Sequence, residues 1–505
     1  MNCFQYHIKN AFLVKGDGSE PVKSELLCSN DGKILAVGHD FVGCGKVLDG
    51  RKQLLVPGFI DAHSHSDISV LPQGSGISKL SQGVTTDIVG NCGLSVFPLT
   101  GKNRGHLEEL YANYQYPFQW QTCAEYLSFL QEKMTVPRIV PLCGHNTLRA
   151  AAAGYDKEQL SRNELQIMIE LLDEALTSGA MGLSFGLLYV PGKFARQDEI
   201  TELMKTVARH DKICTTHLRS EGNELLESIE EFLFCAKSAG LKKLQISHFK
   251  TAGKQNWSKL DAAEELILKA RNEGITLTLD RYPYTESMTQ LSVVLPGKWS
   301  DMDDSKIQKL LQDREERELL TTQLAAAREK ESWKNVRLCS TAHPRYRKDC
   351  GRIFTEITTD PVALAVELLS VDCTGTCAAF AGMSEENLSR IISWDFCMPG
   401  SDGNALPPGN AFGTPHPRSW GTFPRFLKRL LESGTSIREA FFRASGLPAR
   451  TFGLNDRGVL EPGRMADMVL IDPDALEDKA TFLAPDSPAE GILWTMVGGK
   501  LVFQR

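Results

Sequence analysis

Short apolar runs alternate with amphipathic helical segments along the central part of the chain, between residues 56 and 454. Residues 83–93, GVTTDIVGNCG, are typical of a strand. Residues 162–179, RNELQIMIELLDEALTSG, place apolar side chains at the spacing of a helix. We expect further strands at 180–190, 212–220, 242–250, 274–285 and 394–403, and helices at 222–240, 260–274 and 436–453. This alternation predicts an α/β fold with a parallel sheet, most simply a closed (β/α)8 TIM-like barrel.

The two ends of the chain share a different pattern. Residues 1–55 contain short strand-like runs separated by the hairpin signals Asp17-Gly18 and Asp31-Gly32, and residues 455–505 repeat this texture with Pro-Gly and Gly-Gly turns. We therefore expect both termini to build one small β-domain, with residues 56–454 as the catalytic barrel. The charge-rich stretch at about 299–350 does not fit the alternation, so we expect an inserted helical segment or lid there.

Composition excludes several classes of protein. The 505-residue chain carries a formal net charge of -7 and has no long basic run, which argues against nucleic-acid binding. No apolar stretch has the length of a membrane span, and the first residues lack the apolar core of a signal peptide. The 13 cysteines are irregularly spaced, which predicts a reducing cytoplasm. We expect a cytoplasmic enzyme acting on a small molecule; the oligomeric state stays open.

Metal-competent side chains fall where the expected strands end. His63 and His65 close the segment PGFIDAHSH, and in an extended strand their side chains share one face. An isolated pair of this kind is more often a hydrogen-bonded core pair, so a metal site needs further partners. The partners are found at other strand ends: Cys92, His217, His248 and Asp402. Imidazoles, a thiolate and a carboxylate gathered at one end of a barrel suit a zinc hydrolase.

Several stretches carry a resemblance to a known family. In order along roughly residues 55–475, the sequence resembles the D-aminoacylases (N-acyl-D-amino-acid deacylases) of the amidohydrolase superfamily. PGFIDAHSH marks only the superfamily, whereas GNCG, YPYT and HPRSWGTFPR are specific to this branch. The remaining matches are GHNTLRAAAAG, MGLSFGLLYVPG, THLRSEG, ISHFKTAG, DRYPYTES (which contains YPYT), SDG and GVLEPGRMADMVLIDP.

The resemblance implies a metal centre. Most members of the superfamily bridge two metals with a carboxylated lysine, whereas this branch uses the cysteine of GNCG, which matches Cys92. With His217 and His248, this cysteine is implied to hold one tightly bound zinc ion. His63 and His65 would form a second, weaker metal position or line the first.

The resemblance also implies how a substrate is held and cleaved. Asp402 matches the residue that acts first as general base and then as general acid. Lys250, Tyr282 and Arg418 match residues that hold the α-carboxylate of the substrate, a role that suits the planar fork of an arginine. The implied reaction is hydrolysis of the amide bond of an N-acyl-D-amino acid, which gives a carboxylate and a free D-amino acid.

Three alternatives stay open at this point. Residues 182–186, GLSFG, match the GxSxG of serine hydrolases, and Asp402 and His416 follow in the chain order of a triad. Such an elbow turns from strand into helix, whereas we expect residues 187–190 to continue extended. The second alternative is a cyclic amide substrate, such as a dihydroorotate or hydantoin. The third is a scaffold on the same fold that has no catalytic activity.

Overall fold

Two parallel sheets form the centre of the molecule in the computed structural model, which describes residues 3–72, 74–409 and 414–505. One sheet has six strands in the order β17-β13-β12-β11-β10-β9, and the other has three in the order β6-β7-β8. Their bounds are β6 Phe59–Asp61, β7 Val84–Val89, β8 Arg138–Pro141, β9 Cys143–Gly144, β10 Gly182–Gly186, β11 Ile213–His217, β12 Lys243–Ile246, β13 Thr276–Arg281 and β17 Cys397–Pro399. Only Leu142 separates β8 from β9, and a parallel bridge joins Ser64, beyond β6, to Gly403, beyond β17.

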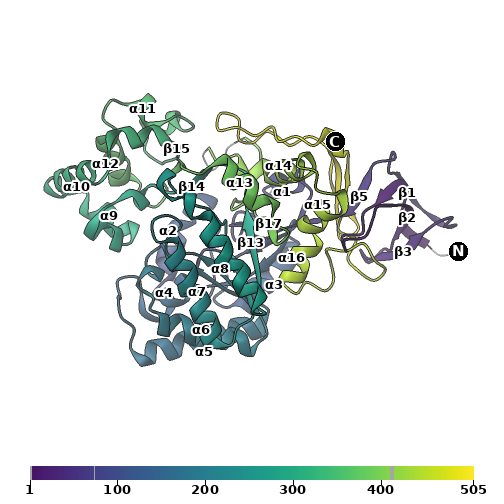
Figure 1. Ribbon diagram of the computed structural model, residues 1–505, viewed down its shortest axis with the longest axis horizontal. Coiled ribbons are helices and arrows are strands. Elements are labelled where there is room, and N and C mark those ends of the chain that lie inside the picture. The colour runs from purple at the N-terminus through teal and green to yellow at the C-terminus, as the bar shows by residue number, and fades with distance from the viewer. Residues whose placement is uncertain (1–2, 73, 410–413) are drawn as a thin grey trace.

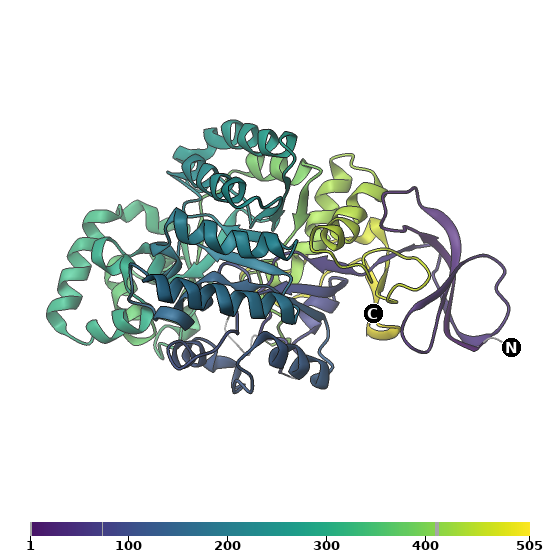
Figure 2. The same ribbon diagram turned by 90° about the horizontal axis from the view of Figure 1, so that it is seen from below.

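Helices follow most of these strands and pack along the outer side of the sheets (Figures 1 and 2). Helix α5 has the predicted periodicity, because its buried residues Met168, Leu172, Ala175 and Leu176 share one face. The helix expected at 436–453 is divided at Ser445. The helices are α1 Ile77–Leu80, α2 Arg104–Leu110, α3 Cys123–Lys133, α4 His145–Ala153, α5 Arg162–Ser178, α6 Gln197–Arg209, α7 Leu225–Ala239, α8 Leu260–Asn272, α13 Glu385–Ser393, α14 Arg418–Glu432, α15 Ile437–Ala444 and α16 Gly446–Thr451.

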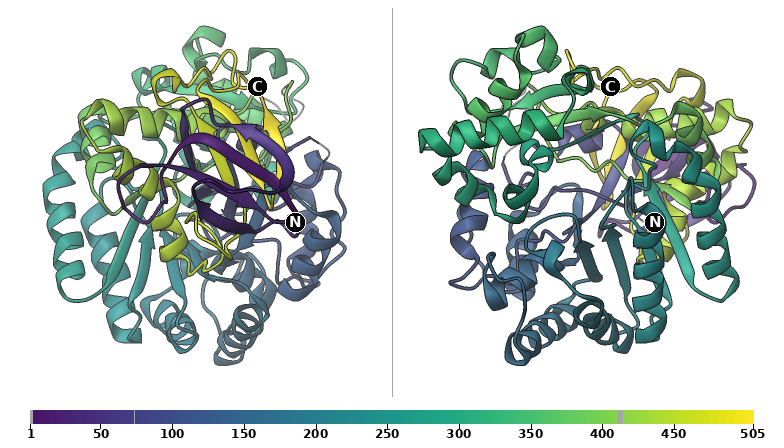
Figure 3. Two further views of the ribbon diagram at one scale, coloured as in Figure 1. Left: turned by 90° about the vertical axis from the view of Figure 1, so that its right-hand side faces the viewer. Right: turned by 60° about the vertical axis from the view of Figure 1, so that its left-hand side comes forward.

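The two ends of the chain meet in one eight-stranded sheet, in the order β20-β19-β18-β5-β1-β2-β3 with β4 paired to β1. Its strands are β1 Cys3–Leu13, β2 Val22–Cys28, β3 Ile34–Gly38, β4 Cys44–Asp49, β5 Leu54–Pro57, β18 Met468–Ile471, β19 Ile492–Val497 and β20 Lys500–Gln504. Antiparallel pairing of β5 with β18 joins the N-terminal part to the C-terminal part. Figure 3 (left) shows the purple and yellow strands side by side in this sheet.

A separate unit interrupts the parallel sheet between β13 and β17 (Figures 1 and 3). It contains the antiparallel strands β14 Glu286–Gln290, β15 Val336–Ser340 and β16 Cys377–Ala381, and the helices α9 Asp304–Leu310, α10 Arg314–Ala327, α11 Phe354–Ile357 and α12 Pro361–Val371. Its apolar residues form their own core, which includes the fully buried Trp299 and Trp333. The interruption is therefore wider than the expected 299–350 and is not purely helical. Strand β14, ESMTQ, is half-buried and largely polar, so its sequence carries little apolar signal.

Within the described residues, none of the helices has both the length and the hydropathy that crossing a bilayer requires.

Candidate metal centre and substrate cavity

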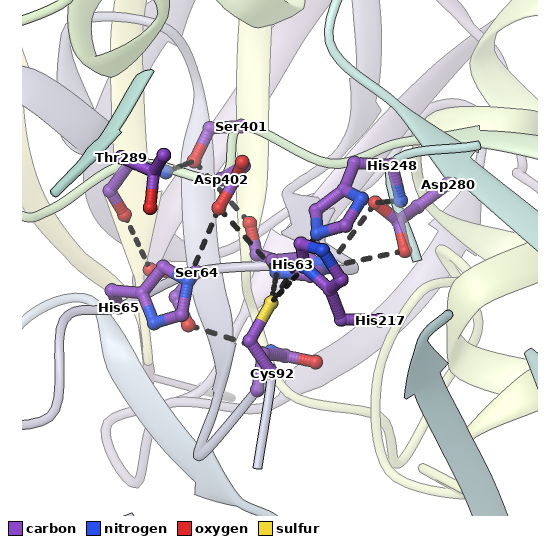
Figure 4. Close-up of polar contacts among 12 residues, drawn as sticks. His63, Ser64, His65, Cys92, His217, His248, Asp280, Thr289, Ser401 and Asp402 are labelled. Carbon is purple, nitrogen blue, oxygen red and sulfur yellow. Dashed lines mark hydrogen bonds and ion pairs between the residues drawn. The ribbon is translucent and has the colours of Figure 1, made fainter. Parts of the chain in front are cut away.

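The side chain of Cys92 lies at the meeting point of three imidazoles (Figure 4). Its Sγ atom is 3.4 Å from Nε2 of His63, 3.6 Å from Nδ1 of His217 and 3.3 Å from Nε2 of His248. These residues come from four separate strand ends, because Cys92 follows β7, His63 follows β6, His217 ends β11 and His248 follows β12. Four of the six residues expected at the metal centre therefore converge on one point.

The spacing of these donor atoms fits a zinc ion. Zn–S bonds of about 2.3 Å and Zn–N bonds of about 2.0–2.1 Å, at a tetrahedral angle, place the sulfur and nitrogen about 3.5 Å apart. The observed separations from Sγ of 3.3–3.6 Å match this value. Candidate ligand atoms of His63, Cys92, His248 and Asp402 also lie within 4.8 Å of one another. Thiolate with imidazole is the donor set that structural and catalytic zinc sites use.

The two remaining expected residues lie beside this cluster. Oδ1 of Asp402 is 3.1 Å from Nε2 of His65 and 3.5 Å from Nε2 of His63. The two histidines of the HxH segment therefore both face the same carboxylate, although β6 ends at Asp61 and both lie beyond the strand on which we expected them. Figure 4 shows Asp402 between His65 and the cluster around Cys92.

Three of these residues have backbone conformations that L-amino acids rarely adopt. The φ angles of Cys92, His248 and Asp402 are 52°, 34° and 50°, in the left-handed region. Each of the three follows a parallel strand, at the point where the chain turns into its loop. Such conformations cost on the order of 1–3 kcal/mol each and concentrate at functional sites. The turns aim three side chains at one point, whereas extended strands would direct them apart.

Electrostatics favours a thiolate at Cys92. Burial raises the pKa of the thiol, but the imidazoles of His63, His248 and His217 together lower it by more, so the pKa lies well below its ordinary value. The thiolate is the form of cysteine that binds a metal. Burial likewise raises the pKa of Asp402, but the guanidinium of Arg418 and the imidazoles of His65, His248 and His63 together lower it by more, so this carboxyl is ionised.

The residues expected to hold a substrate carboxylate line one cavity together with the cluster. Arg418 lies over the ring of Tyr282, with its guanidinium carbon 4.9 Å from the ring centroid. The hydroxyl of Tyr282 is buried and has no hydrogen-bond partner among the described residues. Lys250 contacts Glu221, and its Nζ is 2.9 Å from Nδ1 of His248. The three residues thus bring two cations and an unsatisfied hydroxyl to one wall.

Two carboxylates of the site were not predicted from the sequence. Oε1 of Glu221 is 2.8 Å from Nδ1 of His248, and Oε2 is 3.6 Å from Nε2 of His217. Asp280, at the end of β13, lies 3.3 Å from Nδ1 of His63 and accepts a hydrogen bond of 2.9 Å from the backbone N–H of His248. Both belong to segments that matched the family, THLRSEG and DRYPYT. The sequence feature that could have identified them is their position close to residues that were expected to bind the metal or the substrate.

A buried ion pair supports the turn that carries Asp402. Nζ of Lys79 is fully buried and donates hydrogen bonds to Oδ2 of Asp61 at 2.6 Å and to Oγ of Ser401 at 2.8 Å. The backbone N–H of Ser401 also donates to Oδ1 of Asp61, at 2.8 Å. The strand that precedes His63 is thereby tied to the residue before Asp402. No sequence signal singled out Lys79, because a lysine in a short amphipathic helix is usually exposed.

The serine of the GLSFG segment is structural. Ser184 is fully buried in β10, its hydroxyl donates to the carbonyl of Gly90, and it accepts from the backbone N–H of Gly93 at 3.1 Å. Strand β10 ends at Gly186 and residues 187–190 form a turn, so the expected extended continuation is wrong. A Cβ on Gly186 would lie 1.9 Å from the carbonyl oxygen of Cys92, which shows why close packing requires glycine there. Ser184 is therefore not a nucleophile.

The cavity in front of the cluster has a volume of about 880 Å³. It is lined by loops at the carboxyl ends of the parallel strands and by the inserted unit, which contributes Trp299, Met302 and Asp304. Cavities of about 300–1,000 Å³ are typical of small-molecule sites. The fold and the donor set together define a metal-dependent hydrolase with a small-molecule pocket.

Comparison with known proteins identifies the family. Residues 395–503 match the family model Amidohydro_3, an amidohydrolase family. The chain is 33% identical to the N-acyl-D-glutamate deacylase of Alcaligenes xylosoxydans xylosoxydans over 504 residues, 99% of this chain and 93% of that protein. It is 32% identical to the D-aminoacylase of the same organism, over 99% of this chain and 95% of that protein.

A solved structure extends the similarity to three dimensions. The N-acyl-D-glutamate deacylase of Bordetella bronchiseptica, crystallised with zinc and a phosphonate mimic of the tetrahedral intermediate, superposes with a TM-score of 0.83 at 30% identity. The match covers 99% of this chain and 97% of that one. The chain therefore belongs to the D-aminoacylase family of N-acyl-D-amino-acid deacylases, within the amidohydrolases.

Proposed function

We propose that this protein is a zinc-dependent hydrolase that cleaves the amide bond of N-acyl-D-amino acids, releasing a carboxylate and a free D-amino acid. The observation that carries the proposal is the convergence of Cys92 Sγ with the imidazoles of His217 and His248, next to the carboxylate of Asp402. Family membership supports the same reaction, because relatives over the whole chain are named as deacylases of N-acyl-D-amino acids.

Cys92, His217 and His248 are the proposed ligands of one tightly bound zinc ion. His63 and His65 would form a weaker second position or line the first, with Asp402 3.5 and 3.1 Å from them. A zinc ion held by such ligands supplies Lewis acidity toward the amide carbonyl and makes hydroxide available at neutral pH. The ion pair between Arg418 and Asp402 keeps that carboxylate ionised beside the ligands.

Asp402 is the proposed proton carrier. Its Oδ1 atom faces the metal cluster, where it can accept a proton from the attacking water. The same oxygen then returns the proton to the departing amine nitrogen, which would otherwise leave as an unstable anion. One carboxylate thus serves as base and then as acid.

Lys250, Tyr282 and Arg418 form the proposed clamp for the α-carboxylate. Arg418 engages Asp402 through Nη1, and its remaining N–H groups include the Nη2 that donates to the carbonyl of Met288 at 3.2 Å. The unsatisfied hydroxyl of Tyr282 is the donor that a bound carboxylate would satisfy. Because the clamp fixes one substituent of the α-carbon and the cluster fixes the amide, the enantiomer is selected by the clamp.

The finer architecture is also a proposal. The adjacency of β8 and β9 and the bridge between Ser64 and Gly403 support closure of the two parallel sheets into one barrel over residues 56–454. Residues 1–55 and 455–505 would form the separate β-domain, and the stretch at about 299–350 would belong to an inserted lid. Buried cysteines that form no disulfide, among them Cys143, Cys214 and Cys397, support a cytoplasmic location.

A screen of N-acetyl-D-amino acids, N-acetyl-L-amino acids and cyclic amides tests this function directly. We expect turnover of D-substrates alone, and loss of activity on zinc chelation with recovery on adding zinc back. Preferred hydrolysis of a hydantoin or dihydroorotate would support the cyclic-amide alternative, and no turnover by zinc-loaded protein would support the scaffold.

The variant Cys92→Ala tests the metal centre within the same experiment. We expect it to lose tightly bound zinc and activity together, while the exposed Cys44→Ala retains both. Full zinc occupancy in Cys92→Ala would contradict the proposed ligand set.

A further inference from the structure

Glu221 occupies an unusual place next to the metal cluster. It lies in the loop between β11 and α7, four residues after His217, and 15% of its side chain is exposed. Its two carboxylate oxygens face three different groups of the site: the imidazoles of His217 and His248 and the ammonium of Lys250. None of the proposed steps of the reaction uses this carboxylate.

The imidazole of His248 bridges Cys92 and Glu221. Its Nε2 is 3.3 Å from Cys92 Sγ, and its Nδ1 is 2.8 Å from Oε1 of Glu221. A neutral imidazole carries its hydrogen on one ring nitrogen only. Nζ of Lys250 also lies 2.9 Å from this Nδ1, but its ammonium contacts the same Oε1 of Glu221. With a carboxylate oxygen 2.8 Å away, the hydrogen of the neutral imidazole belongs on Nδ1, and the lone pair is left on Nε2, the nitrogen that faces the cluster.

The imidazole of His217 bridges the same two residues in the opposite sense. Its Nδ1 is 3.6 Å from Cys92 Sγ, and its buried Nε2 lies 3.6 Å from Oε2 of Glu221. This Nε2 has no hydrogen-bond partner among the described residues, so Glu221 is the acidic group positioned to receive its hydrogen. One ring thus presents Nε2 to the cluster and the other presents Nδ1. Each oxygen of one carboxylate lies beside one ring, at 2.8 Å for His248 and, beyond hydrogen-bond distance, at 3.6 Å for His217.

The third partner links the cluster to the substrate clamp. Lys250 contacts Oε1 of Glu221, the same oxygen that His248 approaches, and only 4% of its side chain is exposed. An ammonium on a flexible four-carbon stem has many rotamers in a cavity wall. The contact with Glu221 favours the rotamer in which the Lys250 side chain lies next to the metal cluster.

We infer that Glu221 is a positioning residue that holds both proposed zinc-ligand imidazoles in their binding tautomers and orients Lys250 for the substrate carboxylate. This inference rests on the proposed zinc centre, although its test requires no substrate. A carboxylate that supports a ligand histidine typically contributes about 10–100-fold to metal affinity. Here one carboxylate supports two such ligands.

The variant Glu221→Gln tests the inference, because an amide keeps the shape but has one acceptor oxygen and presents an NH2 group to its other partner. We expect zinc affinity, measured on metal-free protein by competition with a chromophoric chelator, to fall about 10–100-fold. The matched control is Glu230→Gln, an exposed glutamate of α7, which should bind zinc as the unaltered protein does. Zinc affinity unchanged in Glu221→Gln would overturn the inference.

Lys250→Met separates the two parts of the proposed role. It removes the ammonium and leaves the contacts between Glu221 and the imidazoles. We expect KM to rise while zinc affinity stays within about threefold of the unaltered protein. A loss of zinc affinity as large as that of Glu221→Gln would mean that Glu221 acts only through Lys250, and would contradict the inference.

Nitrogen NMR of the histidines in unaltered, metal-free protein gives a test that depends on no variant, because bound zinc would fix the same tautomers without Glu221. We expect His248 to carry its hydrogen on Nδ1 and His217 to carry its hydrogen on Nε2. The opposite tautomer at either ring would refute the positioning role even if Glu221→Gln did not fold. Failure of the deacylase proposal would instead appear as absent turnover with these tautomers and the zinc affinities intact.

Discussion

Nη1 of Arg418 donates a hydrogen bond of 2.6 Å to Oδ2 of Asp402. The residue expected to bind the substrate is therefore also the partner of the proposed proton carrier. An incoming α-carboxylate has to share or replace this contact. The pairing joins two roles that the sequence resemblance had treated as separate.

Arg418→Lys should impair both substrate binding and turnover. A lysine ammonium keeps the charge but cannot bridge Asp402, the carbonyl of Met288 and a substrate carboxylate as a guanidinium can. We expect KM to rise about tenfold, the cost of one lost charged hydrogen bond, and kcat to fall as well. Arg429→Lys on the same helix α14 is the control. A change in KM alone would mean that the contact with Asp402 has no part in catalysis.

Asp402→Asn should retain zinc and lose turnover. The amide cannot accept and return a proton, whereas Cys92, His217 and His248 remain to hold the metal. We expect kcat to fall about 100- to 10,000-fold with zinc content unchanged, measured by steady-state kinetics and metal analysis of the same preparation. The exposed Asp395→Asn should behave as the unaltered protein. Near-full rate in Asp402→Asn would assign the proton transfer to another group.

Gly186→Ala should weaken zinc binding, although Gly186 is not one of the proposed ligands. The added Cβ would lie 1.9 Å from the carbonyl oxygen of Cys92, so the turn that carries the thiolate has to move. We expect a loss of about 1–3 kcal/mol in the free energy of unfolding, and weaker zinc binding. Gly101→Ala is the control, because a Cβ there meets no atom within 4 Å. Zinc affinity and stability like those of Gly101→Ala would show that the turn tolerates displacement.

The charges of the cavity predict which side chains the substrate can carry. Outside the clamp, the described cations on the cavity wall are Lys193, paired with Asp301 at 2.6 Å, and Arg219, paired with Glu231 at 3.0 Å. An acidic side chain on the substrate would therefore bind in the cavity without an unpaired cation beside it. Burying such an unpaired negative charge costs free energy of binding.

We therefore expect kcat/KM for N-acetyl-D-glutamine to exceed that for N-acetyl-D-glutamate by about tenfold or more, since the two substrates have the same shape and differ in charge. N-acetyl-D-leucine should also be accepted. Faster hydrolysis of the glutamate substrate would mean that Lys193 or Arg219 leaves its carboxylate partner when substrate binds.

Much of the site could be predicted from the sequence because its signals are local. The two-residue spacing of His63 and His65 predicted that they face one side, although both lie beyond β6. His217 lies at the end of a segment whose apolar pattern marks it as a strand. Cys92 was one of 13 cysteines and could be singled out only through the resemblance of GNCG to its family. The structure brings its sulfur to the imidazoles, as that resemblance implied.

Other features could not be predicted because they depend on segments that are distant in the chain. Lys79 lies in a helix of four residues, and only the packing of Asp61 and Ser401 around it makes a buried lysine tolerable. The inserted unit begins at a half-polar strand, so neither its bounds nor its strands could be recognised from apolar periodicity.

The sequence by itself determined which side chains stand at the strand ends and which family they belong to, because strand alternation and motif order are properties of neighbouring residues. The tertiary structure alone decided which partners those side chains have: Arg418 with Asp402, and Glu221 with His217, His248 and Lys250. The physical reason is that an ion pair or a hydrogen bond is set by distance in space. These distances arise only when loops at the ends of different strands are packed against one another.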